Sequence, residues 1–80
     1  MTIGDAVRKR ILELCEQHGL SINKLCTLSG VTQSTVNNIV SGRNNSVTVA
    51  TLKKLCDGLG ISIVVFFDSP LFLDLEQELR

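Results

Sequence analysis

Two short helical patterns separated by a single glycine fill residues 21–43, which read SINKLCTLSGVTQSTVNNIVSGR. Ser21 occupies the N-cap position of the first pattern, and Leu25 and Leu28 lie three residues apart on one of its faces. Gly30 then interrupts the pattern, and because glycine adopts positive φ without steric cost, the chain can reverse sharply there. The segment therefore predicts two short helices joined by a tight turn.

The second of these helices is predicted over residues 32–41. Thr32 can cap it, and Gly42 occupies the position at which a left-handed residue commonly ends a helix. Its apolar residues recur at helical spacing and define an inner face: Val36, Ile39 and Val40. The sequence thus predicts a short amphipathic helix directly after the turn.

The outer face of the same helix carries no charge. Its side chains are short uncharged hydrogen-bonding groups: Gln33, Ser34, Asn37, Asn38 and Ser41. An ordinary solvent-facing helix would carry Glu and Lys, which favour helix formation and solubility. Asn and Gln can pair bidentately with adenine, and Ser can hydrogen-bond several bases. This face is therefore a candidate for reading the edges of base pairs.

The remaining patterns indicate further helices. Thr2 and Asp5 have the spacing of a capping box before an apolar stripe that ends near Gly19. A similar pattern runs from Thr48 to Gly60, although Gly58 inside it costs about 1 kcal/mol of helix propensity. These patterns predict one helix on each side of the 21–43 segment.

The last twenty residues are harder to interpret. Residues 61–67 read ISIVVFF, which by itself favours a β-strand, because periodicity cannot distinguish a buried strand from a short helix. Ser69 and Pro70 then form a cap followed by a first helical residue. The apolar residues after them fall on one helical face: Leu71, Phe72, Leu75 and Leu79. This spacing predicts a short C-terminal helix.

Composition is that of one small domain. The chain has 80 residues, 44% of them hydrophobic and only 4% aromatic, which favours an aliphatic helical core. We find no signal peptide, and the longest apolar run, residues 63–67, is far shorter than the roughly 20 residues of a membrane span. A cytoplasmic protein without a membrane segment is expected.

Charge divides the chain into two parts. The net charge is zero, but residues 1–67 hold seven basic and four acidic side chains, a net +3. Residues 68–80 hold one basic and four acidic side chains, a net −3. The sequence therefore predicts a weakly basic domain over 1–67, compatible with a nucleic-acid partner, and an acidic, apolar extension over 68–80.

With these features in place, residues 5–67 resemble the Cro and phage-repressor type of helix-turn-helix protein, an XRE-like family whose domain is a lambda-repressor-like bundle. The residues that carry the resemblance are Ile11, Leu14, Gly19 to Ser21, Leu25, Gly30 to Gln33, Val36, Ile39, Ser41 to Arg43, Leu52, Leu55, Leu59 to Ser62, Phe66 and Phe67. The resemblance implies an all-α bundle of five helices, and it replaces the strand over 61–67 with a short fifth helix capped by Ser62.

The resemblance also implies roles for individual residues. The helix over 32–41 would lie in the major groove of double-stranded DNA, with four side chains nearest the bases: Gln33, Ser34, Asn37 and Asn38. Residues on either side of it would hold phosphates: Ser21, Asn23, Lys24, Arg43, Asn44 and Asn45. Lys24 replaces an acidic residue that is common in the family, and a phosphate neighbour would explain a cation at that helix start.

Surplus apolar residues at the C-terminal end predict self-association. Val64 and Val65 occupy positions that are commonly polar in the family, and they are followed by further large apolar residues. We expect a homodimer whose interface includes Val64, Val65, Phe72 and Leu75. We expect this homodimer to bind an approximately palindromic operator. The alternative is that the terminal segment folds back over the bundle of its own chain.

Other chemistry finds no support in the sequence. The three cysteines are separated by eleven and thirty residues, match no zinc or redox motif, and are interpreted as buried thiols: Cys15, Cys26 and Cys56. No cofactor, metal site or catalytic residue is predicted. The hypothesis is a sequence-specific DNA-binding transcriptional regulator, repressor-like and homodimeric. The alternative is a protein-interaction module on the same fold, such as an antitoxin or an antagonist of another regulator.

Overall fold

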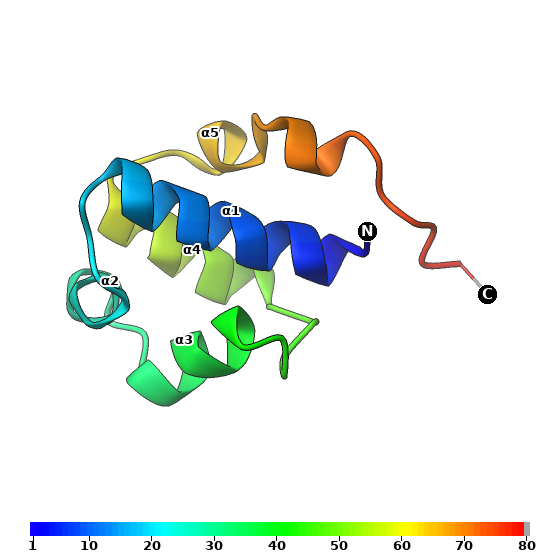
Figure 1. Ribbon diagram of the computed structural model, residues 1–80. Coiled ribbons are helices and arrows are strands. Elements are labelled where there is room, and N and C mark those ends of the chain that lie inside the picture. Colours follow the sequence, from blue (N-terminus) through cyan, green and yellow to red (C-terminus); the bar gives the residue numbers. More distant parts are fainter. Residues whose placement is uncertain (80) are drawn as a thin grey trace.

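The computed structural model describes residues 1–79, which form a bundle of five helices (Figure 1). The elements are, in chain order, α1 (Ile3–Gln17), α2 (Ile22–Ser29), α3 (Gln33–Val40), α4 (Val49–Leu59), α5 (Ile63–Phe67) and a 3-10 helix, η1 (Pro70–Phe72). No strand occurs among residues 1–79. The all-α five-helix architecture is thereby confirmed, and so is the helix over the segment whose composition alone favours a strand.

Each of the five α-helices begins at a hydroxyl residue. The side-chain oxygen of each N-cap accepts the backbone N–H three residues later, at 3.1–3.3 Å: Thr2, Ser21, Thr32, Thr48 and Ser62. Such caps satisfy N–H groups that a helix start otherwise leaves without a partner. Gly30 and Gly60 end α2 and α4 with φ of 72° and 73°, a left-handed conformation that glycine adopts without strain. The predicted helix boundaries are therefore confirmed to within a residue or two.

The core lies between α1 and the three helices that follow it. Its largest fully buried side chains come from all five helices: Phe66, Ile11, Leu25, Ile39, Leu55, Val36 and Cys56. Leu28, which shares the predicted face with Leu25, is instead 49% exposed, and Cys26 is the second buried residue of α2. The inner face of α2 is thus turned by one residue from the predicted one.

Gly58 allows α2 and α4 to approach closely. A Cβ added to Gly58 would lie 2.8 Å from the Cβ of Ser29 and 2.9 Å from its backbone nitrogen. Any side chain at residue 58 would therefore push the two helices apart. Gly58 weakens the last turn of α4 intrinsically, but it permits the packing between α2 and α4 on which the domain depends.

Arg10 of α1 is buried and holds the end of α5. Only 7% of Arg10 is exposed, and its guanidinium donates to the backbone oxygens of Phe66 at 2.7 Å and of Val65 at 2.9 Å. It also forms an ion pair with Glu13. The last carbonyls of a helix have no partner within the helix, so Arg10 acts as a side-chain cap at the C-terminus of α5.

The predicted C-terminal helix is wrong beyond its first turn. Ser69 caps a 3-10 helix of three residues, and residues 73–79 are not helical. Phe72 packs against Phe66 and Phe67, with ring centroids 6.0 and 4.8 Å apart, so the first turn finds apolar surface. Leu73 and Leu79 are 85% and 86% exposed and Leu75 is only half-buried, so the residues after this turn have too little apolar surface to pack against. A helix this short is marginal in water without such packing.

Candidate nucleic-acid interface

The turn between α2 and α3 fixes the arrangement of the two helices. Gly30 reverses the chain, and Val31, only 8% exposed, anchors the turn in the core. The N–H of Val31 donates to the hydroxyl of Ser29 at 3.3 Å, and Thr32 then caps α3. The turn therefore presents the start of α3 at the surface with little freedom to move.

The two faces of α3 differ as the sequence predicts. Val36 and Ile39 are 0% and 1% exposed and seat the helix on the core. Gln33, Ser34 and Asn37 are exposed, and Asn38 is half-buried. All four predicted base-reading residues thus lie on or beside the outer face of one eight-residue helix, which carries no charged side chain.

Gln33 and Asn23 connect the first turns of α3 and α2. The amide nitrogen of Gln33 donates to the side-chain oxygen of Asn23. A residue predicted to contact a base is thereby joined to one predicted to contact a phosphate. No local sequence signal predicts this pair, because the two residues are ten positions apart and the turn between α2 and α3 brings them together.

The start of α2 combines a hydroxyl with an unpaired cation. The Ser21 oxygen accepts the Lys24 N–H at 3.1 Å, which leaves the Ser21 hydroxyl proton available as a donor. Lys24 is exposed, and within residues 1–79 its ammonium forms no ion pair. A phosphate at this helix start would meet a hydroxyl, an ammonium and the positive end of the helix dipole.

The loop after α3 is shaped by its own asparagines. The backbone N–H of Asn44 donates to the carbonyl of Asn38 at 2.9 Å, and the Asn44 side chain accepts the Ser46 N–H at 2.9 Å. The Arg43 guanidinium donates to the hydroxyl of Ser41 at 3.1 Å. Asn45 is exposed at the outer edge of this loop. The loop therefore holds amide and guanidinium donors directly beyond the end of α3.

The basic surface is smaller than the residue count implies. Arg10 is buried and forms an ion pair with Glu13. A guanidinium nitrogen of Arg8 lies 3.9 Å from a carboxylate oxygen of Asp5, and Lys53 forms an ion pair with Asp57. The cations of residues 1–67 that have no ion pair within the described chain are Lys9, Lys24, Arg43 and Lys54. Lys24 and Arg43 come from the segments just before and just after the neutral face of α3.

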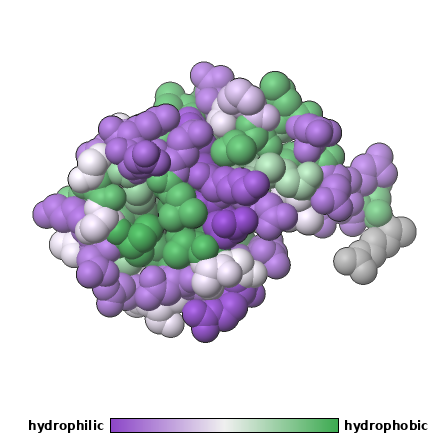
Figure 2. Space-filling view, viewed as in Figure 1, coloured by the Kyte–Doolittle hydropathy of each residue, from purple (hydrophilic) through white to green (hydrophobic). Residues whose placement is uncertain are grey.

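The predicted interface residues fall into two groups. Val64 and Val65 are 78% and 47% exposed on α5, whereas Phe72 is packed against the aromatic rings of its own chain and Leu75 is half-buried. In Figure 2 apolar side chains remain at the surface around α5 and η1. Phe72 thus folds back onto its own chain, as the alternative predicts, whereas Val64 and Val65 leave apolar surface exposed.

The cysteines are buried free thiols, as predicted. Burial raises the pKa of the Cys15 thiol, and the neighbouring Cys26 raises it further. Burial likewise raises the pKa of Cys56, which Lys53 lowers and Asp57 raises. The raised pKa values keep Cys15 and Cys56 as neutral thiols with low reactivity. Within the described residues no group of three potential metal ligands comes together, and no helix is long and apolar enough to cross a membrane.

The fold and the site define a helix-turn-helix domain: two short helices joined at a left-handed glycine, with the second exposing a neutral polar face. A family model described as helix-turn-helix matches residues 11–66 of the chain. The chain therefore belongs to this helix-turn-helix family.

Individual relatives agree with this assignment. The chain is 37% identical over 67 residues to the HTH-type transcriptional regulator PuuR of Escherichia coli (strain K12), and equally to that of Shigella flexneri. These matches cover 84% of the chain but only 36% of each relative, so the chain spans about a third of their length. The crystal structure of the prophage Lp1 protein 11 superposes with a TM-score of 0.81 at 41% identity, covering 94% of this chain and 99% of that one.

Proposed function

We propose that the chain is a sequence-specific DNA-binding transcriptional regulator that inserts α3 into the major groove. The observation that carries this proposal is the outer face of α3, which offers amides and hydroxyls without any charge. The segments on either side of it supply Lys24 and Arg43, which form no ion pair within residues 1–79. The relatives named as HTH-type transcriptional regulators support it. The proposal assigns no catalytic role and places the chain in the cytoplasm, where DNA is accessible.

Specificity and affinity come from different residues in this proposal. Gln33, Ser34, Asn37 and Asn38 read base edges, whereas the phosphates are held by Ser21, Asn23, Lys24, Arg43, Asn44 and Asn45. Asn44 accepts the Ser46 N–H through its oxygen, so its amide nitrogen is the group left to donate to a phosphate. Since Gln33 bonds Asn23, a phosphate held near Asn23 also orients the reading amide of Gln33.

Two copies are proposed to bind one operator. Val64 and Val65 of α5 supply the exposed apolar surface for a two-fold interface. The exposed parts of the half-buried side chains Phe72 and Leu75 extend this surface. Two recognition helices in successive major grooves require half-sites about 34 Å apart, one helical turn of DNA. We therefore propose an approximately palindromic operator and repressor-like action by a homodimer.

The experiment selects bound sequences from a random duplex pool and compares variants on the selected site and on unrelated DNA. Asn38→Ala and Gln33→Ala should cost about 1–3 kcal/mol on the selected site and leave non-specific binding nearly unchanged. Asn38→Ala is the cleaner variant, because Gln33→Ala also removes the hydrogen bond to Asn23.

Lys24→Ala and Arg43→Ala provide the matched contrast. Each should weaken binding to every duplex and reduce the slope of log affinity against log salt by about one, since each removes one phosphate contact. If Gln33→Ala and Asn38→Ala bind all duplexes as the wild type does, α3 does not read DNA. The protein-interaction module, an antitoxin or an antagonist of another regulator, would then replace this proposal.

A further inference from the structure

The acidic tail runs back to the beginning of α1. The backbone N–H of Glu76 donates to the carbonyl of Met1 at 3.0 Å, and the Glu76 carboxylate lies 3.7 Å from the amino group of Met1. Figure 1 shows the N-terminus, the loop after α3 and the tail at the same end of the molecule. These contacts hold the Glu76 carboxylate of the acidic tail beside the start of α1.

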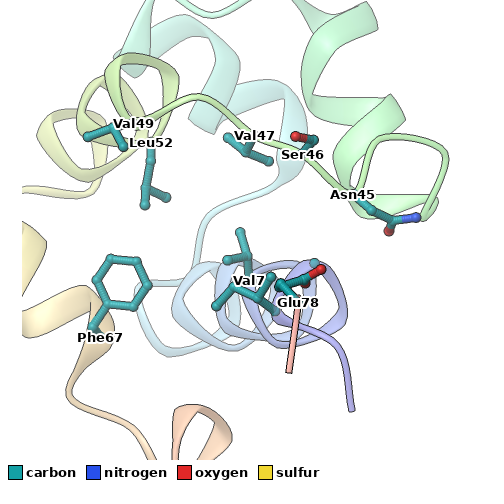
Figure 3. Close-up of a pocket in the computed structure, with 10 residues that line it drawn as sticks. Val7, Asn45, Ser46, Val47, Val49, Leu52, Phe67 and Glu78 are labelled. Atoms are coloured by element: carbon teal, nitrogen blue, oxygen red, sulfur yellow. The ribbon is translucent and has the colours of Figure 1, made fainter. Parts of the chain in front are cut away.

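Glu78 lines the same groove as the loop that follows α3. It lines an open groove of about 420 Å³ together with Asn45 and Ser46, as the close-up in Figure 3 shows. The loop itself lies directly on α1, because a Cβ at Gly4 would approach the Asn45 Cβ to 2.9 Å. The two segments that border the groove, the loop and the first turn of α1, are thus packed together, and Glu78 places a carboxylate at their edge.

We propose that the acidic tail, residues 74–78, competes with DNA for the loop after α3 and so lowers the affinity for every duplex. The inference rests on the proposed function, which places phosphates at Arg43, Asn44 and Asn45. A phosphate that approaches Asn45 comes to the groove that Glu78 also lines, and at any separation below the Debye length of about 8 Å salt screens its repulsion with the Glu78 carboxylate only partly. Binding therefore requires that Glu78 be displaced or that the repulsion be tolerated.

The tail is held weakly enough to be displaced. Within residues 1–79, the polar contacts of the tail with the bundle are the hydrogen bond from the Glu76 N–H to Met1 and one ion pair, in which the Glu76 side chain is 67% exposed. Leu73 and Leu79 are almost fully exposed and anchor it little. A tail of this kind can leave when DNA arrives and return when DNA dissociates.

The test compares two substitutions that change the net charge equally in the full-length chain. Glu78 lines the groove beside Asn45, whereas Asp74 does not. Affinities for the selected site and for unrelated DNA are measured by fluorescence anisotropy in near-physiological salt. Glu78→Gln should bind both duplexes about threefold tighter, and Asp74→Asn should change either affinity by less than about 1.5-fold.

A second measurement follows the tail itself. In NMR spectra of the wild type, the Glu76 amide should be protected from exchange in the free protein and lose that protection when DNA is added. Equal effects of the two substitutions, tighter protection with DNA, or weaker binding by Glu78→Gln would each overturn the competition. Failure of the wild type to bind any duplex would overturn the proposed function, and the inference with it.

Discussion

Replacing Arg10 by methionine tests whether one buried side chain holds α5 onto the bundle. Arg10 is 7% exposed and donates to the carbonyls of Phe66 and Val65, the last residues but one and two of α5. Methionine keeps much of the aliphatic volume and removes all donors. The substitution therefore removes the hydrogen bonds to α5 and the ion pair with Glu13 while it keeps much of the packing of the aliphatic stem.

The expected loss of stability follows from those contacts. A hydrogen bond with a charged partner contributes about 1.5–3 kcal/mol, and a buried carbonyl left without a donor costs a similar amount. Methionine recovers some of the packing, and water can reach the carbonyls at the end of α5 in place of Arg10. We therefore expect the free energy of unfolding to fall by about 3 kcal/mol. The total free energy of unfolding of an 80-residue domain is about 4–12 kcal/mol. The melting temperature should then fall by about 12–24 °C.

Urea denaturation followed by circular dichroism measures the change, with Arg8→Met as the matched control. Arg8 lies on the same helix in a partly exposed ion pair of 3.9 Å with Asp5, so its loss should cost about 0.5 kcal/mol. Arg10→Lys keeps the charge without the planar fork and should fall between the two. An Arg10→Met protein within about 1 kcal/mol of the wild type would refute the capping role of Arg10.

Three further outcomes are expected. Gly58→Ala should destabilise the domain by about 1–3 kcal/mol in urea titrations, although alanine favours helices, because its Cβ would clash with Ser29; a stabilised variant would show that the two helices part easily. Val64→Asp should convert a dimer to a folded monomer in analytical ultracentrifugation, whereas Leu28→Asp on α2 should not, and a wild type that is monomeric at millimolar concentration contradicts the interface. The buried thiols, including Cys15, should react with Ellman's reagent only after urea is added, and rapid labelling of the native protein would count against their burial.

Local chemistry determined most of what the sequence could predict. The helix starts at Thr2, Ser21, Thr32 and Thr48 are capped by contacts within four residues, and the reversal at Gly30 depends on that residue alone. Such features can be predicted from the sequence because the residues that cause them lie next to the structure that they determine. The neutral face of α3 was likewise predictable from helical spacing.

Features that depend on distant neighbours were not predictable in the same way. Arg10 is one of the seven basic side chains behind the predicted weakly basic domain, yet it is buried, and its spacing from Val7 and Leu14 on α1 is the sequence signal that places it on the buried face. The prediction of a C-terminal helix is wrong for the opposite reason. The apolar residues have helical spacing, but only the turn that ends at Phe72 packs against apolar side chains of the bundle. Helical periodicity shows which face of a helix would be buried. It does not show whether another part of the chain lies opposite that face.

The length of α3 connects specificity to assembly. Eight residues at a rise of 1.5 Å give a helix about 12 Å long, which spans about four base pairs of DNA. Each good bidentate contact is worth about 1–3 kcal/mol of discrimination, so a single copy can distinguish only short sequences, which recur often in any genome. In the proposed homodimer, two copies on one operator would add their contacts and double the length of sequence that is read. Val64→Asp should therefore weaken binding to the selected site far more than binding to unrelated DNA, because the phosphate contacts of one copy remain while the second reading helix is lost.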